Sequence, residues 1–301
     1  MSQDSEFLPY VPEDFVEFWT EVQHEAARIP LYFKRESIIV DSAHGHRVEK
    51  IEFRGAQDRL VEGWIAFPTG ARRIPSFLWV PPYGRESLLP NEYGTRADMC
   101  SMSLSFHNEQ AFHQEKYQIG RGYFSSGAES RETWIFRRMM IDVLAALKVL
   151  QAQPEVDEDR IGSMGMSQGG GISLWAAAWS PIVKAVCADM PFLGAMRHSL
   201  NVNAYRYPLK EVVDFMETIP IGRERVMHTI SYFDTLNQAT QVKVPTQVTL
   251  GLKDPACRPE TVRAIYAAIP VEKRLFEYAG GHDWHTEMIA NNRDWLQENM
   301  G

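Results

Sequence analysis

The stretch Arg160-Ile161-Gly162-Ser163-Met164-Gly165-Met166-Ser167-Gln168-Gly169-Gly170-Gly171 decides the fold of this chain. Residues 161–164 predict the end of a short buried strand, and residues 172–179 predict a helix. Between them, residues 165–169 fit the Gly-x-Ser-x-Gly pattern of a nucleophile elbow. A glycine-rich turn can match five positions by chance, but the strand–turn–helix context favours the functional interpretation. The stretch therefore predicts that Ser167 is a nucleophile.

The same turn predicts where a developing oxyanion would bind. A sharp turn exposes the Ser167 hydroxyl at the carboxyl edge of a sheet and leaves the Gln168 amide at a helix N-terminus, where it can donate to an anion. A second amide should come from the loop after an earlier strand. Residues 75–80 predict that strand, and the two prolines after it have no N–H, so the Tyr83 amide is the first available donor.

Composition limits the classes of function. The chain has 301 residues, of which 45% are hydrophobic, so it can bury a sizeable core. Its formal net charge of −8 disfavours nucleic acid or an anionic membrane as a partner. The acidic, polar residues 1–7 show no signal region, and no apolar run is long enough to span a membrane. We therefore expect a cytoplasmic, soluble protein that binds no membrane.

The cysteines predict neither a disulfide framework nor a metal site. Cys100, Cys187 and Cys257 are odd in number and widely spaced, and no cofactor motif accompanies them. Cys187 lies in an apolar run and is expected in the core. Cys257 closely follows Asp254, so it could line a site, although a packing role is favoured. We expect no cofactor and no metal.

The remaining elements predict a mostly parallel α/β sheet with helices on both faces, in a single domain over residues 1–301. Residues 1–70 predict a helix at 12–29 and antiparallel strands at 34–40, 46–53 and 60–67. Residues 193–230 predict a helical lid insertion, and 112–127 a long loop. The other predicted elements are strands at 99–106, 183–188, 245–250 and 273–278 and helices at 133–151, 260–269 and 291–299.

An acid and a base should follow the nucleophile in the order Ser, Asp or Glu, His. Asp254 and His282 each come just after a predicted parallel strand, where catalytic loops gather. We expect His282 to take the Ser167 proton and Asp254 to hold its imidazole. His285 competes with His282, but the glycines before His282 suit a loop that returns toward the elbow. Asp189 is a weaker candidate acid, and His107, His113, His198 and His228 are expected at the surface or in the lid.

Several motifs resemble the acetyl xylan esterase / cephalosporin C deacetylase family. They are Pro12-Glu13-Asp14-Phe15, Phe18-Trp19, Arg160-Ile161-Gly162, Gly165-Met166-Ser167-Gln168-Gly169-Gly170-Gly171, Val183-Lys184-Ala185-Val186, Asp189-Met190-Pro191-Phe192, and Gly251-Leu252-Lys253-Asp254 with Cys257 and Pro259. The resemblance implies an α/β-hydrolase fold and serine hydrolysis of short acyl esters, mainly acetyl groups on sugars or similar alcohols. It matches Ser167 to the nucleophile, Asp254 to the acid, His282 to the base, and Tyr83 and Gln168 to the oxyanion amides. It also implies a homo-oligomer.

The chain departs from the family pattern at three places. Ser105-Phe106-His107-Asn108-Glu109 stands where members usually carry Arg-Gly-Gln, Pro81-Pro82-Tyr83 replaces His-Gly-Tyr, and Asp283 rather than Glu follows His282. The local scaffold there is therefore expected to be rebuilt.

Three functions are compatible with the sequence. A small-molecule carboxylesterase is favoured. A prolyl-oligopeptidase-like serine peptidase shares the triad, but no segment here is the size of a propeller domain. A non-catalytic binding protein on a hydrolase scaffold would not need an ordered set of Ser, Asp and His.

Overall fold

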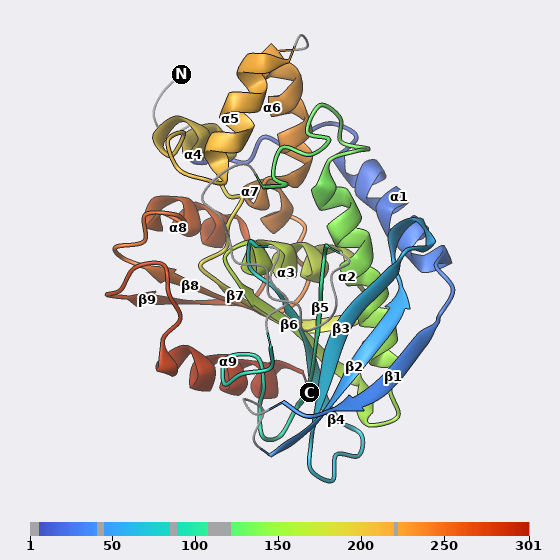
Figure 1. The fold of residues 1–301 in the computed structure, drawn as a ribbon. Coiled ribbons are helices and arrows are strands. Elements are labelled where there is room, and N and C mark those ends of the chain that lie inside the picture. The colour runs from blue at the N-terminus through green and yellow to red at the C-terminus, as the bar shows by residue number, and fades with distance from the viewer. Residues whose placement is uncertain (1–5, 41–44, 85–88, 108–121, 220–221, 301) are drawn as a thin grey trace.

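The computed structural model describes residues 6–40, 45–84, 89–107, 122–219 and 222–300, which form one nine-stranded sheet flanked by helices (Figure 1). The strands lie side by side in the order β1-β2-β3-β5-β4-β6-β7-β8-β9. Their bounds are β1 Phe33–Ile38, β2 His46–Arg54, β3 Leu60–Pro68, β4 Ile74–Val80, β5 Cys100–Leu104, β6 Val156–Met166, β7 Val183–Asp189, β8 Thr246–Gly251 and β9 Lys273–Tyr278.

Strand direction divides the sheet into two parts. Strands β1, β2, β3 and β5 pair antiparallel in succession, while β5, β4, β6, β7, β8 and β9 run parallel. The sheet is therefore mostly parallel, as predicted, and its antiparallel pairs join β1, β2, β3 and β5. Parallel strands align their carboxyl ends, so the loops after β4, β6, β8 and β9 meet at one edge.

Helices cover both faces of the sheet. One buried core joins one face to α1, α2, α3, α7 and α8. A smaller core, which includes Trp295 and Leu296, joins the opposite face to α9. The helix bounds are α1 Phe15–Arg28, α2 Ile135–Gln151, α3 Gln168–Trp179, α4 Met196–Val202, α5 Leu209–Thr218, α6 Gly222–Phe233, α7 Thr235–Ala239, α8 Pro259–Ala268 and α9 Thr286–Asn299, with a short 3₁₀ turn at Ala56–Asp58.

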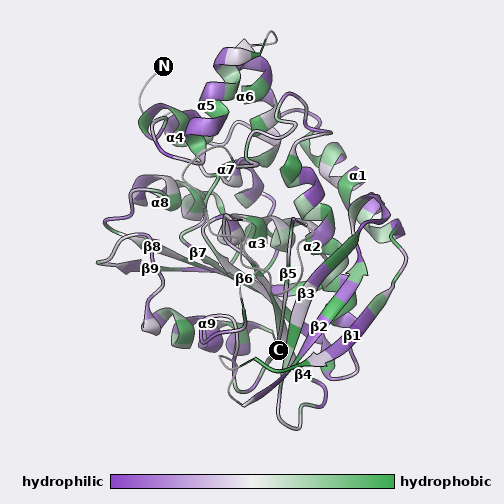
Figure 2. Ribbon diagram, in the orientation of Figure 1, coloured by the Kyte–Doolittle hydropathy of each residue, from purple (hydrophilic) through white to green (hydrophobic). Residues whose placement is uncertain are grey.

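Helices α4, α5 and α6 pack on one another and leave the sheet after the carboxyl end of β7. Figure 1 shows them gathered at one end of the molecule, and Figure 2 shows hydrophobic and hydrophilic residues alternating along α5 and α6. They coincide with the predicted helical segment 193–230. Among the described residues, no helix is both long and apolar enough to cross a lipid bilayer.

The predicted ends of three elements were wrong. Strand β6 is longer than the short buried strand predicted at 161–164: it begins at Val156, and the charged residues 157–160, which show no apolar pattern, form its partly exposed first half. Helix α3 begins at Gln168 rather than Ile172. The prediction started too late because the three glycines at 169–171 have low helix propensity. Helix α9 begins at Thr286 rather than 291, because its exposed first turn has no apolar periodicity. The short α7 was not predicted.

A buried carboxylate ties the N-terminal segment to the helices that follow β7. Asp234 is fully buried and accepts hydrogen bonds from the Tyr10 hydroxyl at 2.5 Å, the Met196 amide at 2.6 Å and the Leu236 amide at 2.9 Å. Burial nevertheless raises the pKa of Asp234 to about 6, because desolvation penalises the charged form. The carboxyl group is therefore protonated more readily in the folded chain than in the unfolded one.

This shift predicts a pH dependence of stability. The folded state binds the Asp234 proton more tightly than the unfolded state, so the free energy of unfolding falls as pH rises from about 4 to about 6 and levels off above that. The expected loss from this group is about 3 kcal/mol. Denaturant unfolding at several pH values should show this fall in the wild type and a smaller one in Asp234→Asn. Equal slopes in the two proteins would contradict the prediction.

Candidate active site

Ser167 lies on a strained turn between β6 and α3. Its backbone angles are φ 59° and ψ −122°, which cost about 1–3 kcal/mol for a residue with a Cβ. The turn is held by its own backbone: the Ser167 amide donates to the Asp189 carbonyl at 2.9 Å, and its carbonyl accepts from Phe192 at 2.9 Å and Gly171 at 3.0 Å. Such strain persists only where the surroundings fix it, which is typical of a functional residue.

Close backbone contacts explain the glycines that flank Ser167. A Cβ on Gly165 would lie 2.6 Å from the Gly169 carbonyl carbon, and a Cβ on Gly169 would lie 2.1 Å from the Val80 carbonyl oxygen. Any side chain at either position would therefore collide with main chain that cannot move aside. The second contact also brings the chain after β4 directly beside the elbow.

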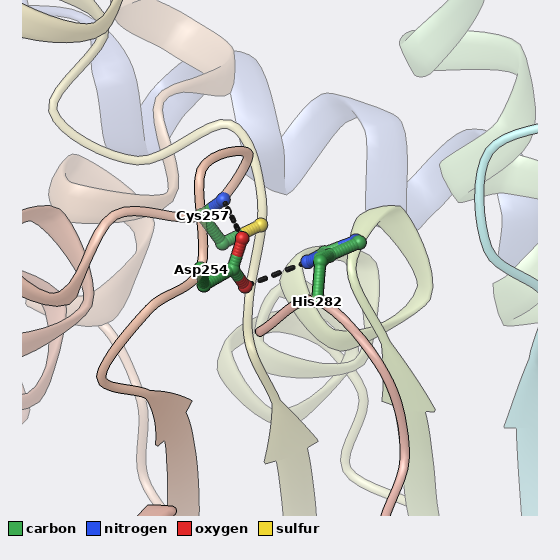
Figure 3. Close-up of side chains that lie close together, drawn as sticks. All are labelled: Asp254, Cys257 and His282. Atoms are coloured by element: carbon green, nitrogen blue, oxygen red, sulfur yellow. Dashed lines mark hydrogen bonds and ion pairs between the residues drawn. The ribbon is translucent and has the colours of Figure 1, made fainter. Parts of the chain in front are cut away.

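Asp254 and His282 are hydrogen-bonded to one another. Asp254 follows β8, His282 follows β9, and the Asp254 Oδ2 to His282 Nδ1 distance is 2.6 Å. The other carboxylate oxygen accepts from the Ala256 amide at 2.7 Å and from the Cys257 amide at 2.9 Å. Figure 3 shows the contacts of Asp254 with His282 and Cys257. The Asp254 side chain is fully buried, whereas that of His282 is 25% exposed. A carboxylate fixed in this way holds Nδ1 as the protonated nitrogen and leaves Nε2 to exchange a proton.

Cys257 places the serine beside this pair. Burial raises the pKa of the Cys257 thiol, and the Ser167 side chain is close enough to lower it in part. The ligand atoms of Cys257, Asp254 and His282 all lie within 4.8 Å of one another. The structure thus gathers the elbow serine, the carboxylate and the imidazole around one thiol. The sequence favoured a packing role for Cys257, and its contact with Ser167 was not predicted.

Sulfur, nitrogen and oxygen donors of this kind could also hold a zinc ion. Here both oxygens of Asp254 have other partners: Oδ2 binds the imidazole and Oδ1 binds two amides. Burial raises the pKa of the Cys257 thiol well above its usual value, which opposes the thiolate that a metal requires. The arrangement suits proton transfer better than metal binding.

The competing residues lie in other surroundings. The fully buried Asp189 carboxylate accepts from Tyr93 at 2.6 Å, Asn292 at 2.7 Å and Thr249 at 2.9 Å, and burial raises its pKa. The Asp189 side chain is therefore hydrogen-bonded within the core. Its backbone carbonyl accepts the hydrogen bond from the Ser167 amide.

His285 lies at the start of α9. Its ring stacks on Tyr278 with centroids 5.0 Å apart. A Cβ on Gly280 would lie 2.6 Å from His285 Nε2, so this nitrogen faces the backbone of the loop before His282.

The segments that carry the two predicted oxyanion amides lie next to one another. Gln168 is the first residue of α3, where the leading amides have no partner within the helix. Tyr83 follows β4, and Tyr123 links the two segments: its hydroxyl accepts from the Gly84 amide at 3.1 Å and donates to Gln168 Oε1 at 3.1 Å. Sequence reasoning did not single out Tyr123, which falls in the predicted loop 112–127.

The other histidines are in different places. His107 is half-buried, and its ring packs on that of Tyr123 with centroids 4.2 Å apart. His198 lies on α4 and contacts Glu6 at 3.0 Å, and His228 lies on α6. His113, Asn108 and Glu109 lie outside the described residues.

A cleft of about 1020 Å³ lies elsewhere on the molecule. Its lining comes from the N-terminal segment around Tyr10, residues 129–132 and α6, and includes none of the elbow or loop residues described above. Its size alone does not make it the reaction site.

The mostly parallel sheet with its order of strands, the nucleophile elbow and the helices on both faces define an α/β-hydrolase. The chain belongs to the acetyl xylan esterase (AXE1) family, whose model matches residues 6–298. It is therefore a carboxylic ester hydrolase that acts on a small-molecule ester.

Individual relatives are distant in sequence and close in fold. The chain is 23% identical to the acetyl esterase Axe7A of Xylanibacter ruminicola over 306 residues, which cover 97% of this chain and 69% of that protein. The solved acetyl xylan esterase of Paenibacillus sp. R4 is 23% identical with a TM-score of 0.87, covering 99% of this chain and 100% of the other. Acetyl xylan esterase 1 of Thermoanaerobacterium sp. is 23% identical with a TM-score of 0.84, covering 99% and 98%.

Proposed function

We propose that this protein hydrolyses acetyl and similarly short acyl esters through an acyl-enzyme formed on Ser167. The observation that carries the proposal is the 2.6 Å contact between Asp254 and His282, beside the Cys257 thiol whose pKa the nearby Ser167 side chain lowers. A nucleophile, a base and a group that orients the base are the minimum for acyl transfer.

The reaction would proceed in two halves. His282 Nε2 takes the Ser167 Oγ proton as Oγ attacks the acyl carbon, and then gives that proton to the departing alcohol. Water, deprotonated by the same nitrogen, attacks the acyl-enzyme, and Nε2 gives that proton to Ser167 Oγ as the acid is released. Asp254 stabilises the imidazolium in both halves, and the amides of Tyr83 and Gln168 stabilise the oxyanion.

The surrounding architecture fits one catalytic domain over residues 1–301, with the segment 193–230 as a lid. In this proposal α4, α5 and α6 shape the entrance for the alcohol part of the substrate. An acetylated sugar is the expected substrate, since relatives named for acetyl xylan share the family model and the fold. A homo-oligomeric state and a cytoplasmic location stay predictions from the sequence.

A substrate panel tests the proposal. Purified protein is assayed on p-nitrophenyl acetate, butyrate and octanoate, on acetylated xylan fragments, on cephalosporin C and on a peptide anilide. We expect the acetyl esters to give the highest kcat/KM and the anilide to be left intact. Preferential cleavage of the anilide would indicate a peptidase, and no turnover of any substrate would indicate a binding protein on this scaffold.

A further inference from the structure

We propose that Tyr123 is a positioning residue that sets the spacing between the two halves of the oxyanion hole, an inference that rests on the proposed function. Tyr123 is 3% exposed, and its single hydroxyl contacts both segments. It accepts from the Gly84 amide, next to Tyr83, and donates to the side chain of Gln168, each at 3.1 Å. One oxygen atom therefore connects the loop after β4 to the first residue of α3.

Aromatic packing fixes the Tyr123 ring between its neighbours. Its centroid lies 4.8 Å from that of Tyr83 and 4.2 Å from that of His107. A Cβ on Gly122 would lie 2.3 Å from the Tyr83 hydroxyl, so the Tyr83 side chain lies directly against the backbone before Tyr123. Tyr83, which carries one proposed oxyanion amide, is thus packed against Tyr123. Tyr123 in turn bonds to the side chain of Gln168, which carries the other proposed amide.

The stretch 122–125 is in turn anchored to α5. The carboxylate of Glu211, which is 3% exposed, accepts from the Gly122 amide at 2.7 Å, the Ser125 amide at 3.0 Å and the Ser125 hydroxyl at 2.8 Å. Bonds to an ionised acceptor are the stronger kind, so they hold the short stretch that presents Tyr123. The anchor connects the lid segment to the oxyanion hole.

An oxyanion hole contributes most when its donors are already aimed at the charge that develops in the transition state. Two amides on separate segments keep their spacing only if something joins the segments. Loss of the Tyr123 hydroxyl would let the loop after β4 shift relative to α3, while the ester in its ground state would bind as before. The effect should therefore appear in kcat and not in KM.

The test uses Tyr123→Phe, which keeps the ring stack and removes only the hydroxyl. With p-nitrophenyl acetate we expect kcat to fall about 10-fold and KM to change less than about two-fold. The rate of inactivation by a fluorophosphonate should fall by the same factor, because phosphonylation also places negative charge in the oxyanion hole. The melting temperature should stay close to that of the wild type.

Tyr232→Phe is the matched control. Tyr232 is also buried, and its hydroxyl donates to Asp14, away from the elbow. This variant should keep the wild-type kcat. If kcat of Tyr123→Phe equals that of Tyr232→Phe, the inference is overturned.

A second variant tests the same contact if Tyr123→Phe does not fold. Gln168→Met removes the acceptor of the Tyr123 hydroxyl and keeps the backbone amide, and it should lower kcat by a similar factor. The double variant should be no slower than the slower single one, because both break the same contact. Multiplied effects would overturn the inference. A wild-type protein without esterase activity would instead contradict the proposed function.

Discussion

Replacing Ser167 with alanine is expected to lower kcat on p-nitrophenyl acetate by about 10⁴-fold or more. The substitution removes the oxygen that attacks the acyl carbon, and no other group at the elbow can form the ester intermediate. Alanine also relieves none of the backbone strain, since the turn keeps a positive φ and its hydrogen bonds. The variant should therefore fold, which circular dichroism and a thermal melt would check. Steady-state kinetics gives the loss in rate.

Cys257 is the matched control, because it is the other candidate nucleophile within reach of His282. Its thiol is 2% exposed and its raised pKa keeps it protonated near neutral pH, so it is a poor nucleophile there. A fluorophosphonate probe should label the wild type and Cys257→Ala, and should not label Ser167→Ala. Labelling that survives Ser167→Ala and disappears with Cys257→Ala would assign the nucleophile to the thiol.

The elbow could be predicted from sequence because its geometry is local. A positive φ at Ser167 and the collisions that any side chain would cause at Gly165 and Gly169 leave a five-residue signature. The hydrogen bond between Asp254 and His282 joins two residues chosen by their places after strands, which works because parallel strands share a carboxyl edge. The catalytic roles of these residues stay predictions.

The contacts that escaped prediction join residues that lie far apart along the chain. Tyr123 and Gln168 are 45 residues apart, and Gly122 and Glu211 are 89 apart. Neither pair carries a local pattern, because each depends on how an irregular loop and a lid helix are brought together. The contact between Cys257 and Ser167 is of the same kind. In the same way, the charged start of β6 carried no apolar signal, and the pairing with β4 shifts register there, from Val156 directly to Ile161.

The choice between two histidines three residues apart gives the second large expected effect. His282→Ala should lower kcat by about 10⁴-fold, because without the imidazole the Ser167 proton has no acceptor in line with attack. His285→Ala should keep kcat within about three-fold of the wild type, since its ring stacks on Tyr278 and its Nε2 faces the Gly280 backbone. Both variants are measured with p-nitrophenyl acetate under the same conditions.

The two histidines should also differ in their effect on stability, and here His285→Ala should have the larger effect. His285 begins α9 and is partly buried against Tyr278, so its loss should lower the melting temperature by an amount that corresponds to about 1 kcal/mol. His282 is partly exposed and packs mainly through the bond to Asp254, whose carboxylate keeps two backbone donors without it. His282→Ala should therefore be inactive and close to wild type in stability, whereas His285→Ala should be active and less stable. Activity that survives His282→Ala and is lost in His285→Ala would show that the imidazole bonded to Asp254 is not the base, and the proposed relay would then be wrong even though the ester hydrolase remained.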